Sequence, residues 1–267
     1  MSAFPDLPRR FAGTTAYVEE GKGEPLLFIH GVGMRAEAWT PQIAEFSSTH
    51  RVIAMDLLGH GQSAVAPRPE RLGDYVAQAR SLTETLGLSH VTLVGHSLGA
   101  LVALGFALDH PEATARVAAL NAVYCRDAES RRAVEARAAE IASKGDAGDV
   151  EVPLKRWFGD ASDPRYTDVH AAVKRWLLGV NPEGYAAAYR IFAMSDRAHA
   201  GRLPDLAVPA LFATGPGDPN STPAMSQAMA AEAPKARAEI IPGARHMMSL
   251  VEVDEVNAML RRFLESD

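Results

Sequence analysis

Short, almost purely apolar runs alternate along this chain with longer stretches in which apolar residues recur at helical spacing. The apolar runs are only four to seven residues long. Runs of this length that are apolar on both faces are typical of strands buried within a parallel sheet. Six runs are predicted as strands: Leu26–His30, Arg51–Asp56, Val91–Val94, Val117–Leu120, Ala207–Ala213 and Ala238–Ile241.

Helices are expected between these runs. The regular alternation of the two kinds of segment predicts an α/β fold, a parallel sheet with helices on both faces. A pair of short strands around Phe11–Glu19 is expected to extend one edge of the sheet in antiparallel fashion. The predicted helices are Trp39–Ser47, Leu72–Leu86, Leu98–Asp109, Ser226–Ala233 and Val253–Ser266.

One long segment, residues 123–205, breaks this alternation. It contains no convincing strand, and apolar residues such as Val173, Trp176 and Leu177 recur in it at helical spacing. Glycines and prolines divide the segment into about four short helices. We therefore predict a core formed by residues 1–122 and 206–267, with residues 123–205 inserted between its two parts.

Composition and charge exclude several classes of protein. The chain has 267 residues, 47% of them hydrophobic, which is enough for a large core. The net charge is −6, and the charged residues form no long run of one sign along the sequence. We therefore expect neither a nucleic acid nor a membrane surface as partner. No apolar run reaches the roughly 18 residues of a membrane span. Pro5, Asp6 and Pro8 stand where a signal peptide needs an apolar core, so we expect a cytoplasmic protein. The sequence leaves the assembly state open, and a homodimer is one possibility.

Metal sites and cofactors are not expected. The single cysteine, Cys125, excludes an intrachain disulfide and is too few for a cysteine-based zinc site. We interpret Cys125 as a small core residue rather than a reactive thiol. The nine histidines include no His-x-x-x-His pair, the spacing that would place two metal ligands on one face of a helix.

A Gly-x-Ser-x-Gly motif directly follows the predicted strand Val91–Val94 and leads into a predicted helix. A nucleophile elbow requires this strand–turn–helix context. The turn would hold Ser97 at a strained backbone angle, and the small residues Gly95 and Gly99 would let strand and helix approach closely. We therefore expect Ser97 to be a nucleophile and the Leu98 N–H to face the developing oxyanion. The alternative is a tight turn with an incidental serine.

Two loops further along the chain offer the partners that a serine nucleophile needs. Asp218 follows the predicted strand Ala207–Ala213, and His246 follows the last predicted strand. Ligand sites in α/β sheets lie at the carboxyl ends of the strands. We expect His246 to be the base and Asp218 to be the acid that fixes its tautomer. A turn-capping role is the alternative for Asp218.

A second oxyanion donor is expected in the glycine-rich turn after Leu26–His30. Gly31 and Gly33 allow the backbone to face a pocket, and the N–H of Val32 between them is the best candidate donor. A phosphate loop is the alternative reading of this turn. We reject it because the turn lacks both the Lys-Ser/Thr pair and the Gly-x-Gly-x-x-Gly spacing of nucleotide-binding loops.

Five motifs along the whole chain resemble those of the α/β-hydrolase superfamily, in the same order. They are His30-Gly-x-Gly, Asp56-x-x-Gly-His-Gly-x-Ser63, Gly95-His-Ser-Leu-Gly99, Gly215-x-x-Asp218-Pro and Gly243-x-x-His246. The resemblance implies an eight-stranded, mostly parallel sheet flanked by helices, with residues 123–205 as a helical cap over the active site. It looks closest to bacterial enol-lactonases, carboxylesterases and meta-cleavage carbon–carbon hydrolases.

Carried over onto this sequence, the resemblance implies Ser97 as nucleophile, His246 as base and Asp218 as acid. It also implies Val32 and Leu98 as the donors of the oxyanion hole. A serine nucleophile argues against haloalkane dehalogenases and epoxide hydrolases. The first glycine-rich turn lacks the run usual in carbon–carbon hydrolases, which makes that activity less favoured.

Aromatic and methionine side chains of the cap and of the site turns are candidates for an apolar acyl pocket. The alternative is that the aromatic residues hold the cap helices onto the core. Arg35, just after the oxyanion turn, is a candidate partner for a substrate carboxylate, with a merely exposed arginine as the alternative. The predicted substrate-binding residues are Met34, Arg35, Trp157, Trp176, Tyr189 and Met247.

These residues predict a serine hydrolase that cleaves a small ester or lactone through an acyl-enzyme. Carbon–carbon bond hydrolysis or perhydrolysis on the same Ser-His-Asp triad is one alternative. A ligand sensor that keeps the fold without turnover is another, because fold does not determine function.

Overall fold

The computed structural model describes residues 4–65, 71–144, 149–159 and 163–266. Eight strands form one sheet in the order β1-β2-β4-β3-β5-β6-β7-β8. The pairs β1·β2 and β2·β4 are antiparallel and all other pairs are parallel, which confirms the predicted fold class and its antiparallel edge. The strands are β1 (Arg10–Ala12), β2 (Thr15–Glu20), β3 (Glu24–Ile29), β4 (His50–Met55), β5 (Val91–His96), β6 (Thr114–Leu120), β7 (Ala210–Thr214) and β8 (Ala236–Ile240).

Strand β3 shows why the central strands are apolar at successive positions. Leu26, Leu27, Phe28 and Ile29 are all fully buried. Successive side chains of a strand point to opposite faces of the sheet. Accordingly, Leu27 and Ile29 belong to one hydrophobic cluster, whereas Leu26 and Phe28 belong to the other. Both faces of the sheet are therefore covered.

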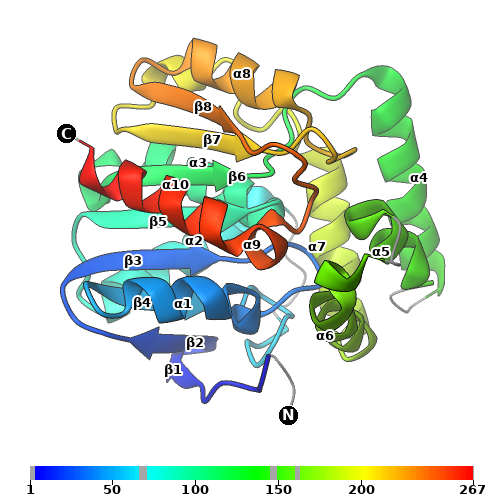
Figure 1. Ribbon diagram of the computed structural model, residues 1–267, viewed down its shortest axis with the longest axis horizontal. Helices are drawn as coiled ribbons and strands as arrows, with labels where there is room; N and C mark the ends of the chain where they lie inside the picture. Colours follow the sequence, from blue (N-terminus) through cyan, green and yellow to red (C-terminus); the bar gives the residue numbers. More distant parts are fainter. Residues whose placement is uncertain (1–3, 66–70, 145–148, 160–162, 267) are drawn as a thin grey trace.

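Helices cover the two faces of the sheet (Figure 1). Phe46 and Phe263 belong to the cluster on one face, and Tyr75, Phe106 and Met229 belong to the cluster on the other. The first face is covered by α1 (Thr40–Phe46), α9 (Met248–Val251) and α10 (Val253–Glu265), and the second by α2 (Leu72–Thr85), α3 (Leu98–Asp109) and α8 (Pro223–Glu232). Each helix predicted for the core corresponds to an observed one, with ends shifted by at most a few residues.

The segment between β6 and β7 forms four α-helices and no strand in its described part. Figure 1 shows these helices grouped at one end of the sheet, beyond the carboxyl ends of the parallel strands. We propose this group, within residues 123–205, as the cap; residues 145–148 and 160–162 of that range lie outside the described residues. The helices are α4 (Ala128–Lys144), α5 (Glu151–Phe158), α6 (Thr167–Leu178) and α7 (Pro182–Met194).

A contact between two glycines joins α7 to the core. A Cβ atom on Gly184, in the first turn of α7, would lie 2.2 Å from the carbonyl oxygen of Gly59. Gly59 lies in the turn after β4 at φ +71°, and a Cβ there would lie 2.4 Å from the Cα of Gly184. Only glycine allows the two backbones to come this close. Side-chain packing is therefore absent at this point of attachment.

The prediction that Cys125 is a core residue is wrong. The side chain of Cys125 is exposed, although its neighbours Tyr124 and Arg126 are buried. The chain turns just after β6, where Cys125 takes a φ of +47°. This turn directs the thiol away from the sheet.

In the described ranges, no helix combines the length and the apolar character that a membrane span requires.

Candidate active site

Ser97 lies in the turn between β5 and α3, at φ +56° and ψ −116°. Such a φ is rare for a residue other than glycine and is sustained only where the surroundings impose it. Here the surroundings are two close approaches: a Cβ on Gly95 would lie 2.1 Å from the carbonyl oxygen of Gly99, and one on Gly99 would lie 2.1 Å from that of Ile29. The strained serine and the small flanking residues agree with the prediction from the sequence.

His246 and Asp218 form a buried hydrogen bond. The Nδ1 atom of His246 lies 2.7 Å from Oδ2 of Asp218, and neither residue is more than 3% exposed. An ionised carboxylate only accepts hydrogen bonds, so Nδ1 carries the proton. The Nε2 atom of the neutral ring is then the acceptor, which is the tautomer that a general base requires.

The carboxylate of Asp218 is held by more than the histidine. Its Oδ2 accepts from Ser221 Oγ at 2.5 Å and from Asn121 Nδ2 at 2.8 Å, and its Oδ1 accepts from the Asn220 N–H at 2.8 Å. Burial alone would raise the pKa of Asp218, but the charge and hydrogen bonds of His246, Ser221 and Asn220 lower it well below its usual value. Asp218 is therefore ionised and fixed in place.

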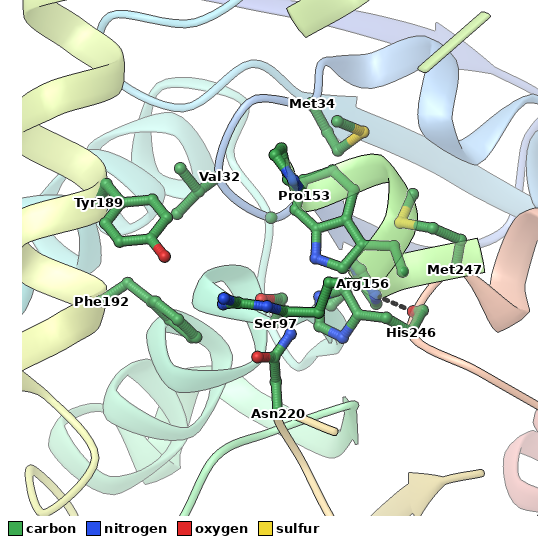
Figure 2. Close-up of a pocket in the computed structure, with 13 residues that line it drawn as sticks. Val32, Met34, Ser97, Pro153, Arg156, Tyr189, Phe192, Asn220, His246 and Met247 are labelled. Atoms are coloured by element: carbon green, nitrogen blue, oxygen red, sulfur yellow. Dashed lines mark hydrogen bonds between the residues drawn. The ribbon is translucent and has the colours of Figure 1, made fainter. Parts of the chain in front are cut away.

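Ser97 and His246 line the same cavity (Figure 2). Within the described ranges, Ser97 Oγ makes no direct hydrogen bond to His246. Catalytic hydrogen bonds of unliganded enzymes are often long and shorten in the complex with substrate. The imidazole itself contacts two rings, His96 at a centroid distance of 4.8 Å in a tilted arrangement and Trp157 at 5.6 Å in a stacked one.

The two expected oxyanion donors are free to serve an incoming ligand. Neither the Val32 nor the Leu98 N–H donates to an acceptor in the described part of the chain. Val32 belongs to the turn after β3 and lines the cavity, and Leu98 begins α3 directly after Ser97. Both N–H groups thus lie where the sequence places them, at the carboxyl ends of β3 and β5. Their role as oxyanion donors stays a prediction.

Buried histidines hold the Val32 turn in place. His60 Nε2 accepts a hydrogen bond from the Gly33 N–H at 3.0 Å, and His30 Nε2 accepts from the Leu57 N–H at 3.0 Å. Burial lowers the pKa of His30 to about 3 and also lowers the pKa of His60. Both rings are therefore neutral and act as fixed acceptors for backbone groups.

The cavity is lined by the core turns and by α5 and α7 of the cap. Met34, Trp157, Tyr189 and Met247, which the sequence predicted as substrate-binding residues, all line it. Phe192, one of the cap aromatics considered for an apolar pocket, lines it as well. Sequence reasoning missed three further residues of the cavity wall, which are Pro153, Arg156 and Asn220.

Arg156 is the most consequential of the missed residues. It precedes Trp157 on α5, and Figure 2 shows it pointing into the cavity. The only signal for Arg156 in the sequence was its position beside a predicted pocket tryptophan. The signal for Asn220 was its position two residues after Asp218, a predicted catalytic residue.

Two of the predicted substrate-binding residues do not line the cavity. Arg35 Nε lies 2.7 Å from the buried carboxylate of Glu37, so its charge is already engaged there. Trp176 packs edge-on against Phe4 at a centroid distance of 5.8 Å. The predictions for Arg35 and Trp176 are therefore wrong. Arg35 is engaged in a local ion pair, and Trp176 packs the cap helix α6 against the core at Phe4.

No group of histidine, cysteine and acidic side chains in the described ranges could hold a metal ion. The described cavity instead combines one serine, a histidine held by a carboxylate, the unused N–H of Val32 and one arginine, and the unused N–H of Leu98 directly follows the serine. These groups can supply a nucleophile, a base, an oxyanion hole and a carboxylate partner.

Comparisons with known proteins agree with the fold. The profile of the alpha/beta hydrolase family matches residues 26–259. A relative from Acinetobacter baylyi, (E)-2-((N-methylformamido)methylene)succinate hydrolase, is 43% identical over 253 residues, which cover 95% of each protein. The 3-oxoadipate enol-lactonase 1 of the same species is 27% identical over 202 residues, 74% of this chain and 72% of the relative.

A solved structure agrees in fold. The enol-lactonase from Burkholderia xenovorans matches with a TM-score of 0.84 at 24% identity, over 97% of this chain and all of that one. At this identity the likeness establishes the fold alone. Together with the family match, the named relatives support an enzyme of the hydrolase class.

Proposed function

Because the chain belongs to the α/β-hydrolase family, we propose that it is a serine hydrolase in which Ser97 attacks a carbonyl carbon of the substrate. The observation that carries the proposal is the buried His246–Asp218 hydrogen bond at the cavity that Ser97 lines. A turn with only a structural role would need neither a strained serine nor a histidine fixed in one tautomer.

In the proposed reaction, His246 takes the hydroxyl proton of Ser97 as Oγ bonds to the carbonyl carbon. The N–H groups of Val32 and Leu98 stabilise the resulting oxyanion, each by about 3 kcal/mol. The proton on His246 then passes to the leaving atom as the bond from that atom to the carbonyl carbon breaks. A water molecule, deprotonated by His246, releases the acyl group and regenerates Ser97.

Arg156 supports a substrate that carries a carboxylate, because its guanidinium matches a carboxylate in shape and charge. The A. baylyi relative is named for a succinate with an N-acyl-aminomethylene substituent. We propose a substrate of this kind for the present chain, with cleavage of the bond between the acyl carbon and nitrogen. The leaving nitrogen is conjugated through the carbon–carbon double bond to a carboxylate, which lowers its basicity and makes it a better leaving group.

A small ester or lactone is the second candidate substrate. The enol-lactonase relative and the apolar part of the cavity wall, which includes Met34, Tyr189 and Met247, favour it. Esters and enamides react at Ser97 through the same acyl-enzyme and differ only in the leaving atom. The same site also serves the carbon–carbon and perhydrolysis alternatives, so turnover of a substrate panel decides among them.

Covalent labelling tests the nucleophile. A fluorophosphonate probe is expected to modify Ser97 in the wild-type protein, and Ser97→Ala is expected to abolish labelling and to lower turnover on the order of 10³–10⁶-fold. Ser143→Ala, at an exposed position of α4, is the matched control and should behave as the wild type. Folded wild-type protein that does not react with the probe would favour the sensor instead.

Turnover of three substrates then tests the substrate class. The panel consists of (E)-2-((N-methylformamido)methylene)succinate, an enol lactone that carries a carboxylate, and 4-nitrophenyl acetate. We expect the highest kcat/KM for the first compound. Arg156→Gln should raise KM for the two carboxylates far more than for the neutral ester. A preference for the neutral ester in the wild type would contradict the proposed role of Arg156.

A further inference from the structure

Arg126 is a buried cation that the protein only partly satisfies. It follows β6 and is 3% exposed. Its Nη1 atom makes two long hydrogen bonds of 3.4 Å, to the carbonyl oxygens of Phe192 and Ala193. Its Nη2 atom has no hydrogen-bond partner among the described residues. A buried polar group without a partner is rare and calls for an explanation.

The nearest carboxylate does not compensate the charge of Arg126. Asp196 Oδ1 lies 3.9 Å from Arg126 Nη1, which is too far for a hydrogen bond. The other oxygen of Asp196 accepts from the Arg126 backbone N–H at 2.8 Å and from Arg131 Nη2 at 3.0 Å. Burial of a charge with so weak a counter-charge is unfavourable. In keeping with this, burial lowers the pKa of Arg126.

A second buried arginine shows what full compensation looks like. The Arg9 side chain is 1% exposed, and its guanidinium donates to both carboxylate oxygens of Glu37, to both of Asp56 and to the carbonyl oxygen of Leu7. These partners raise the pKa of Arg9 despite its burial. Arg126 lacks such a set among the residues that the structure describes.

The guanidinium of Arg126 contacts a residue that lines the active-site cavity. Its Cζ atom is 4.6 Å from the ring centroid of Phe192, which lines the cavity (Figure 2). Arg126 also borders a groove on the surface, and Asn220 lines both this groove and the cavity. Phe192 thus contacts the unsatisfied cation and also lines the cavity.

We propose that Arg126 is a second carboxylate-binding residue of this cavity, exposed to the ligand when the Phe192 side chain turns aside. The inference rests on the proposed function and extends it: Arg156 would hold one carboxylate of the substrate and Arg126 the other. The substrate class is then a small dicarboxylate. The ligand supplies the counter-charge that the described residues do not provide, which accounts for the unpaired Nη2.

Binding of two matched ligands tests the inference without turnover. Succinate and succinamate have nearly the same shape, but an amide replaces one carboxylate in succinamate. Titration calorimetry should show that the wild type binds succinate at least about 10-fold more tightly than succinamate. Arg126→Gln should reduce this ratio to about 1 to 3. Arg131→Gln, which removes the other arginine bound to Asp196, is the control and should keep the wild-type ratio.

A variant of Phe192 provides an independent readout that does not require the loss of Arg126. Phe192→Leu shortens the layer in front of the guanidinium, so the preference for succinate should increase. The preference should disappear again in the double variant with Arg126→Gln. Circular dichroism and thermal melting identify the folded variants to be compared.

Several results would overturn the inference. A wild type that binds the two ligands equally, an Arg126→Gln variant that keeps the preference, or a Phe192→Leu variant with the wild-type ratio would each do so. Equal weakening of both ligands by Arg126→Gln would show a structural role instead. Failure of the proposed function is distinguishable, because it is read from Ser97 labelling and substrate turnover rather than from ligand binding.

Discussion

The Nδ1 atom of His246 lies 2.7 Å from Oδ2 of Asp218, and that oxygen also accepts hydrogen bonds from Ser221 and Asn121. The carboxylate therefore has donors on several sides and little freedom to rotate. Since it can only accept, the imidazole is confined to the tautomer with its proton on Nδ1. The orientation of the histidine is fixed before any ligand arrives.

Asp218→Asn should lower kcat about 10⁴-fold, because the amide can donate to Nδ1 and so favours the wrong tautomer of His246. Steady-state hydrolysis of an activated ester measures the effect. Asp127→Asn is the control: Asp127 is exposed and accepts from the Ser130 N–H at the start of α4. Similar rates for Asp218→Asn and the wild type would mean that another carboxylate serves His246.

His60→Ala should lower kcat by about 10-fold or more while KM changes little. The Gly33 N–H loses its acceptor, the Val32 turn gains freedom, and the oxyanion donor is no longer preorganised. Rates should be expressed per active site titrated with a fluorophosphonate, so that a loss of folded protein does not lower the measured kcat. His50→Ala, at the start of β4, is the matched control. An unchanged kcat in His60→Ala would show that this ring does not hold the oxyanion turn in place.

The free energy of unfolding should decrease as the pH falls from about 6.5 towards 3. Burial lowers the pKa of His30 and of His96 to about 3, whereas in the unfolded chain a histidine has its ordinary value. Between these values the unfolded state binds more protons, so each group contributes a slope of up to about 1.4 kcal/mol per pH unit. Urea unfolding at several pH values measures the slope. His30→Gln should flatten it, and His90→Gln, at an exposed position, should not.

Gly184→Ala should destabilise the protein by about 1–3 kcal/mol, because the added methyl group would overlap the backbone of Gly59. Thermal or urea unfolding measures the change. Gly179→Ala is the matched control in the same cap, since a Cβ there comes no closer than 3.4 Å to another atom. Equal stability of the two variants would indicate that α7 shifts freely on the core.

The sheet and the turns at its carboxyl edge could be predicted because their signals are local. A buried parallel strand such as β3 is apolar at successive positions, here Leu26 to Ile29, and the elbow at Ser97 needs its glycines at fixed offsets. His246 and Asp218 could be predicted for the same reason, since each follows a strand whose direction the alternation of strands and helices determines. The hydrogen bond between them was then a consequence of topology.

The residues that the cap contributes were harder to predict, because periodicity identifies a helix but not the neighbour that its face contacts. Arg35 is adjacent to the oxyanion turn in sequence, yet Glu37 binds it; the cation of the cavity is Arg156, from a helix more than a hundred residues away. The sequence supports Trp157 and Trp176 equally as pocket residues, because both are tryptophans of predicted cap helices. Only the packing of α5 and α6 places Trp157 at the cavity and Trp176 against Phe4.

The backbone contact between Gly59 and Gly184 has a consequence for redesign. Because α7 is attached there without side chains, a new specificity is best sought by exchanging residues of α5, which brings Pro153, Arg156 and Trp157 to the cavity. Libraries built on that helix would vary ligand choice while leaving the contact between Gly59 and Gly184 unchanged.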